Sequence, residues 1–165
     1  MTDKVEIALT INGRTHRVAV EPRRTLADVI RDDCGQTGTH LGCEHGVCGA
    51  CTILLDGEAV RSCLMFAVQA QNRDICTVEG LQNGPELHPL QKAFIAHHAL
   101  QCGFCTPGFL MLAAGALERN PDIDDEELVD LLSSNLCRCT GYENIVKAVQ
   151  AARAEMKAAS MKVAP

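Results

Sequence analysis

The sequence has little aromatic content and no stretch suited to entering or crossing a membrane. It contains no Trp, one Tyr and four Phe among 165 residues, so a folded core must be mainly aliphatic. No run of about 18 apolar residues is present, so no membrane span is predicted. The first residues lack the basic region and apolar core of a signal peptide. We therefore expect a cytoplasmic chain, whose thiols stay reduced.

The sequence also lacks an excess of basic charge. It has 15 Lys and Arg against 21 Asp and Glu, a formal net charge of −6. Because nucleic-acid binding needs a basic surface that neutralises phosphates, we expect no nucleic-acid partner. The length suits one domain or two small ones. Units of about 80 residues have marginal cores, which bound metal often stabilises.

Cysteine, in contrast, is abundant. Ten cysteines in a reducing compartment favour metal ligation over disulfides. Four of them follow the plant-type [2Fe–2S] ferredoxin spacing, Cys-x4-Cys-x2-Cys with a more distant fourth: Cys43, Cys48, Cys51 and Cys63. Five glycines lie among or just before the first three, and their N–H groups would donate hydrogen bonds to cluster sulfurs. The pattern predicts a two-iron cluster.

A second set of four consists of two short-spaced pairs: Cys102, Cys105, Cys137 and Cys139. A metal that joins them would link two predicted helices. Structural zinc is the main alternative, because all-cysteine zinc sites use similar two-residue spacings. A thioredoxin-type disulfide is an alternative for either Cys-x2-Cys pair. Eight cysteines that sort into two sets favour clusters over both, and the remaining Cys34 and Cys76 are interpreted as buried thiols.

The first half of the chain has the pattern of a small sheet. Apolar residues alternate over 5–11 and again over 16–20, and Asn12-Gly13 between them predicts a tight hairpin turn. The further predicted elements are a helix over 26–33, a hairpin of 52–55 and 58–62, a helical stretch over 64–70 and a strand over 75–78.

The second half has helical patterns. Residues 80–88 are rich in Gln, Asn, Gly and Pro and form a predicted linker. Helices are predicted over 90–100, 106–117, 124–136 and 142–159. We therefore divide the chain into a [2Fe–2S] ferredoxin-like domain, residues 1–80, and a helical [2Fe–2S]-binding domain, residues 81–165.

Three stretches carry a family resemblance. They are residues 42–52, GCEHGVCGACT, residues 101–108, QCGFCTPG, and residues 135–142, NLCRCTGY. In this order and at these separations they resemble the signatures of the iron–sulfur (small) subunit of the molybdenum hydroxylase family, of the xanthine dehydrogenase and carbon monoxide dehydrogenase small-subunit type. The resemblance covers nearly the whole chain.

The resemblance implies a fold, cofactors and partners. The fold class is α+β, with an N-terminal β-grasp ferredoxin-like domain followed by an all-α four-helix-bundle domain. The chain would hold two [2Fe–2S] clusters, while molybdopterin and FAD are expected on partners, a large molybdopterin-binding subunit and a medium FAD-binding subunit. Gln101 and Cys139 would contact the pterin. Electrons would pass from molybdopterin through the helical-domain cluster and the N-terminal cluster to flavin.

The predicted function is therefore electron transfer within a molybdenum-dependent hydroxylase or dehydrogenase. We identify no catalytic residue, because the sequence offers no nucleophile–base pattern and no phosphate loop. A free-standing soluble two-cluster ferredoxin is the alternative, and it would be stable without partners. A zinc-stapled interaction module is a third possibility, and it would be colourless.

Overall fold

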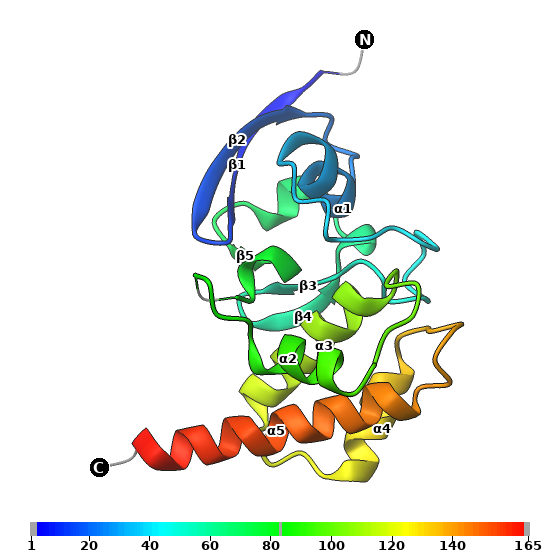
Figure 1. The fold of residues 1–165 in the computed structure, drawn as a ribbon. Helices are drawn as coiled ribbons and strands as arrows, with labels where there is room; N and C mark the ends of the chain where they lie inside the picture. Colours follow the sequence, from blue (N-terminus) through cyan, green and yellow to red (C-terminus); the bar gives the residue numbers. More distant parts are fainter. Residues whose placement is uncertain (1–2, 83, 164–165) are drawn as a thin grey trace.

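The computed structural model describes residues 3–82 and 84–163, with side chains up to Ser160. Figure 1 shows a sheet-containing unit, drawn in blue to cyan-green, above a unit of helices, drawn in green to red. The long helix α5 (Glu143–Val163) crosses the end of the molecule farthest from the N-terminus. None of the helices within these described residues is both long and apolar enough to cross a membrane.

The chain opens with the predicted hairpin. β1 (Val5–Ile11) pairs antiparallel with β2 (Arg14–Val20). Alternate residues of β1, namely Ile7, Leu9 and Ile11, are buried, as the period of a half-buried strand requires. Asn12 and Gly13 both have positive φ, 51° and 73°, the combination that a tight hairpin turn needs.

Three further strands complete a mixed sheet. They are β3 (Thr52–Leu55), β4 (Glu58–Arg61) and β5 (Asp74–Cys76), and the sheet order is β2-β1-β5-β3-β4. β1 and β5 run parallel, and the other pairs are antiparallel. Helix α1 (Leu26–Asp28), capped by Thr25 and continued by a π-helical turn (Val29–Asp33), contributes Leu26 and Ile30 to the core under the sheet. This is the predicted β-grasp arrangement.

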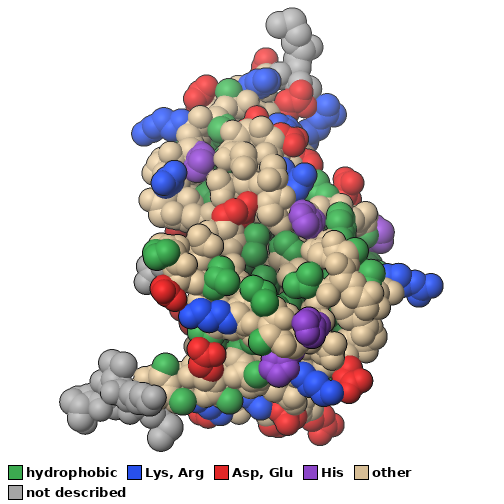
Figure 2. Space-filling view, in the orientation of Figure 1, with side chains coloured by type: hydrophobic (Ala, Val, Ile, Leu, Met, Phe, Trp, Pro, Cys, Tyr) green, Lys and Arg blue, Asp and Glu red, His purple; other side chains and the backbone are tan. Residues whose placement is uncertain are grey.

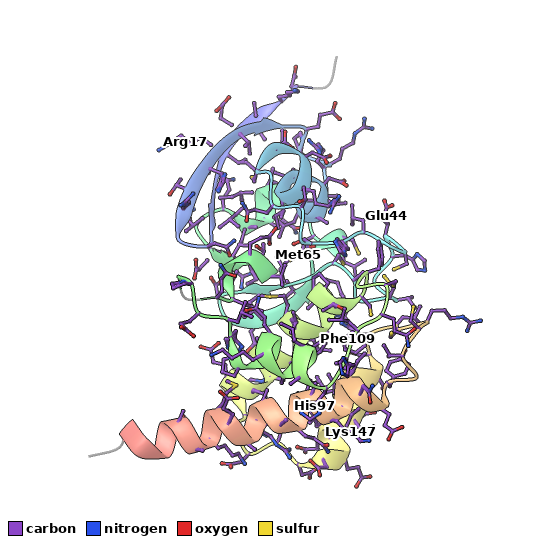
Figure 3. The ribbon with its side chains drawn as sticks, viewed as in Figure 1. Arg17, Glu44, Met65, His97, Phe109 and Lys147 are labelled. Carbon is purple, nitrogen blue, oxygen red and sulfur yellow. The ribbon has the colours of Figure 1, made fainter. Side chains whose placement is uncertain are left out.

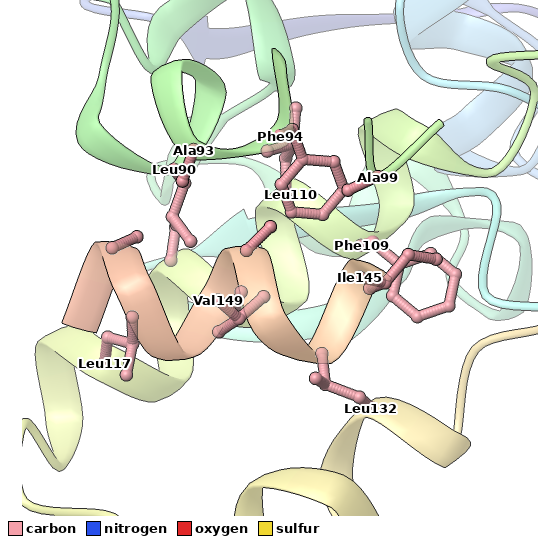
Figure 4. Packing of buried hydrophobic residues seen from close by; sticks show 14 of the residues in the cluster. Leu90, Ala93, Phe94, Ala99, Phe109, Leu110, Leu117, Leu132, Ile145 and Val149 are labelled. Carbon is pink, nitrogen blue, oxygen red and sulfur yellow. The ribbon is translucent and has the colours of Figure 1, made fainter. Parts of the chain in front are cut away.

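Four helices form the second unit. They are α2 (Pro89–Ala96), α3 (Thr106–Arg119), α4 (Asp125–Ser133) and the already named α5. Their shared core contains Phe94, Phe109, Leu128 and Val149. Figure 4 shows this core around α5, with Ile145 and Val149 directed at the neighbouring helices. The predicted fold class, α+β with a helical second domain, is confirmed.

Several element ends differ from the sequence-based expectation. The helix predicted over 90–100 ends at Ala96, because His98 takes a positive φ of 51° and the N–H of Ala99 bonds back to the Phe94 carbonyl at 2.9 Å. The stretch 64–70 forms two short 3₁₀ turns, Ser62–Leu64 and Ala67–Ala70, in place of one helix. Such ends depend on tertiary contacts more than on local pattern.

The two units are packed directly together through α3. This helix lies against β3 and β4. A Cβ built on Gly108 would lie 2.3 Å from the Gly49 carbonyl oxygen, so only glycine allows α3 to approach the cysteine-bearing loop this closely. At the other end of α3, Arg119 forms an ion pair with Glu58 at 2.6 Å. The junction brings the two cysteine loops side by side.

Candidate metal centres

The first cysteine set lies on the loop before β3 and in the 3₁₀ turn Ser62–Leu64 that follows β4. Gly46 and Gly49 have positive φ, 86° and 72°, which lets the loop turn tightly around its thiols. The N–H of Cys48 donates to the Cys43 sulfur at 3.3 Å. A Cβ on Gly42 would lie 3.0 Å from the Cys48 sulfur. The loop therefore wraps closely around its own cysteine sulfurs, as the glycine pattern predicted.

Burial divides this first set into two pairs. Cys51 and Cys63 are buried, and their thiols interact with each other. The Ser62 hydroxyl donates to the Cys51 carbonyl at 2.7 Å and holds the two ligand segments together. Burial, followed by the nearby Cys51 thiol, raises the pKa of Cys63 to about 11. Cys43 belongs to the outer pair, and hydrogen bonds from the N–H groups of Cys48 and His45 lower its pKa to about 6.

The second set lies at the N-terminus of α3 and in the loop between α4 and α5. The sulfurs of Cys102 and Cys139, both exposed, lie 3.5 Å apart. Cys105 and Cys137 form the inner pair, and their thiols interact. Burial, with Cys137 beside it, raises the pKa of Cys105 to about 12. The Cys102 thiol likewise raises the pKa of Cys139.

Hydrogen bonds fix the loop that carries Cys137. Its N–H donates to the Tyr142 hydroxyl at 2.8 Å, and the Thr140 hydroxyl donates to its sulfur at 3.1 Å. Burial alone would raise the pKa of Cys137, but the hydroxyl and N–H of Thr140 bring that pKa below its ordinary value. The Tyr142 ring packs edge-on against Phe109 of α3, with centroids 6.1 Å apart. The ligand loop is thereby anchored to the helical core.

The donor sets fit two-iron clusters. Within residues 3–82 and 84–163, no group of three or more His, Cys, Asp or Glu side chains is arranged to hold a single metal ion. The eight sulfurs instead form four pairs, 43 with 48, 51 with 63, 102 with 139, and 105 with 137. Two thiolates for each of two irons is the ligation of a [2Fe–2S] cluster. The buried Thr106 hydroxyl next to Cys105 has no partner among the described residues, so it remains available to a bound group.

Both cysteine sets border one cavity of about 330 Å³. Its walls are mostly apolar, and Phe104 and Leu136 contribute side chains that are about half exposed. His40 stacks on Phe104 with centroids 5.0 Å apart, and its Nδ1 donates to the Phe104 carbonyl at 2.7 Å. The cysteines that line the cavity are Cys43, Cys48, Cys102, Cys105, Cys137 and Cys139.

Most residues singled out from the sequence lie at this edge of the molecule. Gln101 is exposed and directly precedes Cys102. Figure 3 shows sulfur atoms gathered near the loop that carries Glu44, where the two units meet. Cys34 is buried, and burial raises its pKa to about 11, while burial also raises the pKa of the partly buried Cys76. Neither thiol lines the shared cavity.

Sequence reasoning overlooked the residues that fix the second cysteine loop and those that join the two loops. Thr140 and Tyr142 lie inside the third motif, three residues after Cys137 and Cys139 respectively, and a hydroxyl at this spacing was the available signal. Phe104 and Asn135 lie inside the second and third motifs, but the sequence assigned no contact to either, and His40 gave no signal. Their role depends on contacts across 64 to 86 positions, which no local pattern encodes.

Comparison with known proteins agrees with this geometry. Residues 9–79 match the family model for a 2Fe-2S iron-sulfur cluster binding domain, and residues 77–150 match a [2Fe-2S] binding domain. The nicotine 6-hydroxylase small subunit of Paenarthrobacter nicotinovorans is 62% identical over 90% of this chain and 89% of that protein. The caffeine dehydrogenase subunit gamma of Pseudomonas sp. (strain CBB1) is 55% identical over 87% of this chain and 88% of its own length.

A solved structure gives the same result for the fold. The crystal structure of quinoline 2-oxidoreductase from Pseudomonas putida 86 has a chain that superposes with a TM-score of 0.90 at 51% identity, over 95% of this chain and 98% of that one. Two cluster-binding models match in the order of the two cysteine sets. The chain belongs to the iron–sulfur small-subunit family of the molybdenum hydroxylases.

Proposed function

We propose that this chain carries electrons from a molybdopterin centre on a large subunit to flavin on a medium subunit of a molybdenum-dependent hydroxylase. The observation that carries the proposal is the presence of two four-cysteine sets, each divided into an inner and an outer pair, both of which contribute cysteines to one cavity. A cluster bound by each set supplies a one-electron carrier. The proposed ligands are Cys43, Cys48, Cys51 and Cys63 in one set and Cys102, Cys105, Cys137 and Cys139 in the other.

The chain's own residues prepare these sites in three ways. Three of the four inner cysteines, Cys51, Cys63 and Cys137, are buried from water, and Cys105 is partly buried. Backbone N–H groups point at sulfur, as at Cys43, and such hydrogen bonds tune a cluster potential. Helix α3 begins at Thr106, beside Cys105, and the helix dipole favours negative charge at this N-terminus. All three features suit an anionic group held by thiolates.

The outer pairs indicate which way each site faces. Cys102, Cys139 and Gln101 are exposed together, and we propose that they meet the pterin of the large subunit. At the first set, Val47 and Leu64 are exposed by 65% and 62%, and we propose that the medium, flavin-binding subunit covers them. Apolar side chains are exposed at both sites, Val47 and Leu64 at the first and Phe104 and Leu136 at the second. Their exposure supports the proposal that the chain works inside an assembly.

The free-standing ferredoxin alternative is not supported by the relatives. The two curated relatives described above are named as subunits, and so is the 6-hydroxypseudooxynicotine dehydrogenase subunit beta. We also propose a cytoplasmic location, in keeping with the reduced thiols that cluster assembly needs. A division into residues 1–80 and 81–165 agrees with the two separate cores but stays a proposal.

Paired cysteine substitutions test the ligand assignment. In the intact assembly we expect about four irons per chain, two per cluster, and two distinct EPR signals after reduction. Cys63→Ser should alter only the signal of the sheet-containing unit, and Cys137→Ser only that of the helical unit. Loss of both signals from either folded variant would contradict the partition. Zinc in place of iron would refute the cluster proposal itself.

A further inference from the structure

The two cysteine loops are joined by a backbone hydrogen bond. The N–H of Leu136 donates to the carbonyl of Cys48 at 2.9 Å. Cys48 belongs to the first proposed ligand set, and Leu136 directly precedes Cys137 of the second. The position of one set is therefore tied to that of the other through main-chain atoms. What holds this contact in place is the side chain next to it.

That side chain is Asn135, a polar residue that is only 1% exposed. Its Nδ2 donates to the Gly49 carbonyl at 3.4 Å. Its Oδ1 occupies the space where a side chain at position 49 would stand, 1.9 Å from a Cβ built on Gly49. Gly49 has a φ of 72°, so the loop there adopts a conformation that glycine tolerates best. Asn135 thus fills the gap that a glycine leaves in the first cysteine loop.

Residues of the sheet-containing unit also bind the Gly49 carbonyl and the end of α4. The Thr52 hydroxyl donates to the same Gly49 carbonyl at 2.6 Å and accepts from Arg61. The other Arg61 nitrogen, Nη2, donates to the Ser134 carbonyl at 3.0 Å, at the end of α4. Hydrogen bonds therefore run from Asn135 and its neighbour Ser134 around to the Gly49 peptide. Both units contribute to this network, and both ligand loops lie beside it.

We propose that Asn135 is a positioning residue that sets the separation and orientation of the two cluster sites, acting with Thr52 and Arg61 on the Gly49 peptide. The inference rests on the proposed function, because it takes the two cysteine sets as cluster ligands. Asn135 touches backbone, and it acts on the sites through Gly49 and Leu136.

Stability alone does not account for an asparagine here. Its Oδ1 is buried without a partner among the described residues, which disfavours folding relative to an apolar side chain of similar size. A leucine would fill much the same volume with no such penalty. The amide instead donates a hydrogen bond to the Gly49 carbonyl. Because a hydrogen bond depends on orientation, it fixes the orientation of one loop relative to the other, which apolar packing does not do.

The test compares Asn135→Leu with Leu128→Ala in the intact assembly. Leu128 is fully buried in the core of α4 and lies outside the network, so its truncation reports a general loss of packing. The readouts are iron content, the EPR spectrum of each reduced cluster, and the magnetic interaction between the two. For Asn135→Leu we expect iron content to stay near that of the wild type and the interaction between clusters to change. For Leu128→Ala we expect the interaction to be retained.

Thr52 provides a second, independent pair of variants in case Asn135→Leu does not assemble. Thr52→Val removes the hydroxyl at nearly constant shape and should change the magnetic interaction between the two clusters. Thr52→Ser keeps the hydroxyl and should retain the wild-type interaction. An unchanged interaction in Asn135→Leu, or equal changes in Thr52→Val and Thr52→Ser, would overturn the positioning role. A wild-type assembly that lacks two iron–sulfur signals would instead refute the proposed function.

Discussion

At the scale of single residues, the close approach of α3 to the sheet-containing unit decides which substitutions its glycines tolerate. Gly108 and Gly115 both lie on α3, but their surroundings differ. A Cβ on Gly108 would meet the Gly49 carbonyl oxygen at 2.3 Å, and that oxygen belongs to a loop fixed by several hydrogen bonds. A Cβ on Gly115 would lie 2.8 Å from the end of the Leu54 side chain and 3.3 Å from the Gly57 carbonyl oxygen, so its closest contact is with a side-chain methyl group and its backbone contact is much looser than that of Gly108. An alanine should therefore destabilise the chain much more at position 108 than at position 115.

We expect Gly108→Ala to lower the free energy of unfolding of the iron-loaded chain by about 1–3 kcal/mol, the usual range for overpacking. Gly115→Ala is the control, and we expect its free energy of unfolding to be unchanged or slightly higher. The reason is that alanine in a helix interior gains about 1 kcal/mol over glycine, which offsets the small shifts required of Leu54 and of the Gly57 carbonyl. Denaturant titration of both variants measures the difference. Equal losses at the two positions would show that the contact with Gly49 is not the limiting one.

At the scale of elements, sequence reasoning succeeded where the determining signal is local. The β1–β2 hairpin follows from alternation and from Asn12-Gly13, and α3 follows from Thr106-Pro107. The ends of helices were less predictable, since the C-terminus of α2 depends on the Ala99 N–H reaching back to the Phe94 carbonyl. The cysteine sets were readable as spacings. Their division into inner and outer pairs was not, because the burial of Cys51 and Cys63 depends on packing against Ala27, and that of Cys137 on the helical core, and neither contact is encoded in the spacing.

The start of α2 gives a prediction about pH. His88 caps this helix: its Nδ1 accepts from the Leu90 N–H at 3.2 Å, and only an unprotonated Nδ1 can do so. Burial lowers the pKa of His88 below 6.5, while Glu118 opposes the shift. The unfolded chain therefore binds the proton more readily than the folded one. The contribution of this cap to stability is complete above about pH 6.5 and is lost as the pH falls through the lower folded-state pKa.

Hydrogen exchange of the α2 amides in the intact assembly measures this effect. Protection of α2, corrected for intrinsic exchange rates, should fall between about pH 7 and pH 5 in the wild type. His88→Asn is the matched control, because asparagine is a good N-cap that does not titrate in this range. Its α2 protection should be nearly independent of pH over the same interval. A parallel decline in both proteins would assign the pH dependence to other groups.

At the scale of the whole molecule, the chain presents two apolar rims beside its two cysteine sets. The first rim consists of Val47, Leu64 and Phe66, and the second of Leu100, Phe104 and Leu136, with exposures from 40% to 65%. Figure 2 shows hydrophobic side chains gathered across the middle of one face, at the level where the two units of Figure 1 meet. Two polar contacts join the two units, the buried Asn135–Gly49 hydrogen bond and the exposed Arg61–Ser134 hydrogen bond, so the rims are held in a fixed relation. A rigid chain with two such rims is suited to lie between two partners.

The two rims should therefore contact different subunits, and single charges should separate them. Leu64→Asp places a carboxylate on the first rim, and we expect it to weaken association with the flavin-binding subunit at least tenfold, about 1.4 kcal/mol, while the large subunit stays bound. Leu100→Asp on the second rim should have the reverse effect. Val129→Asp is the control, because Val129 is 47% exposed on α4 and borders a hollow whose lining includes no residue of either rim. Pull-down from the co-expressed assembly, followed by dissociation measurements on each pair of subunits, gives the affinities. If Leu64→Asp released the large subunit instead, the assignment of the two rims to the two partner subunits would have to be exchanged. If both variants behaved like Val129→Asp, neither rim would be an interface.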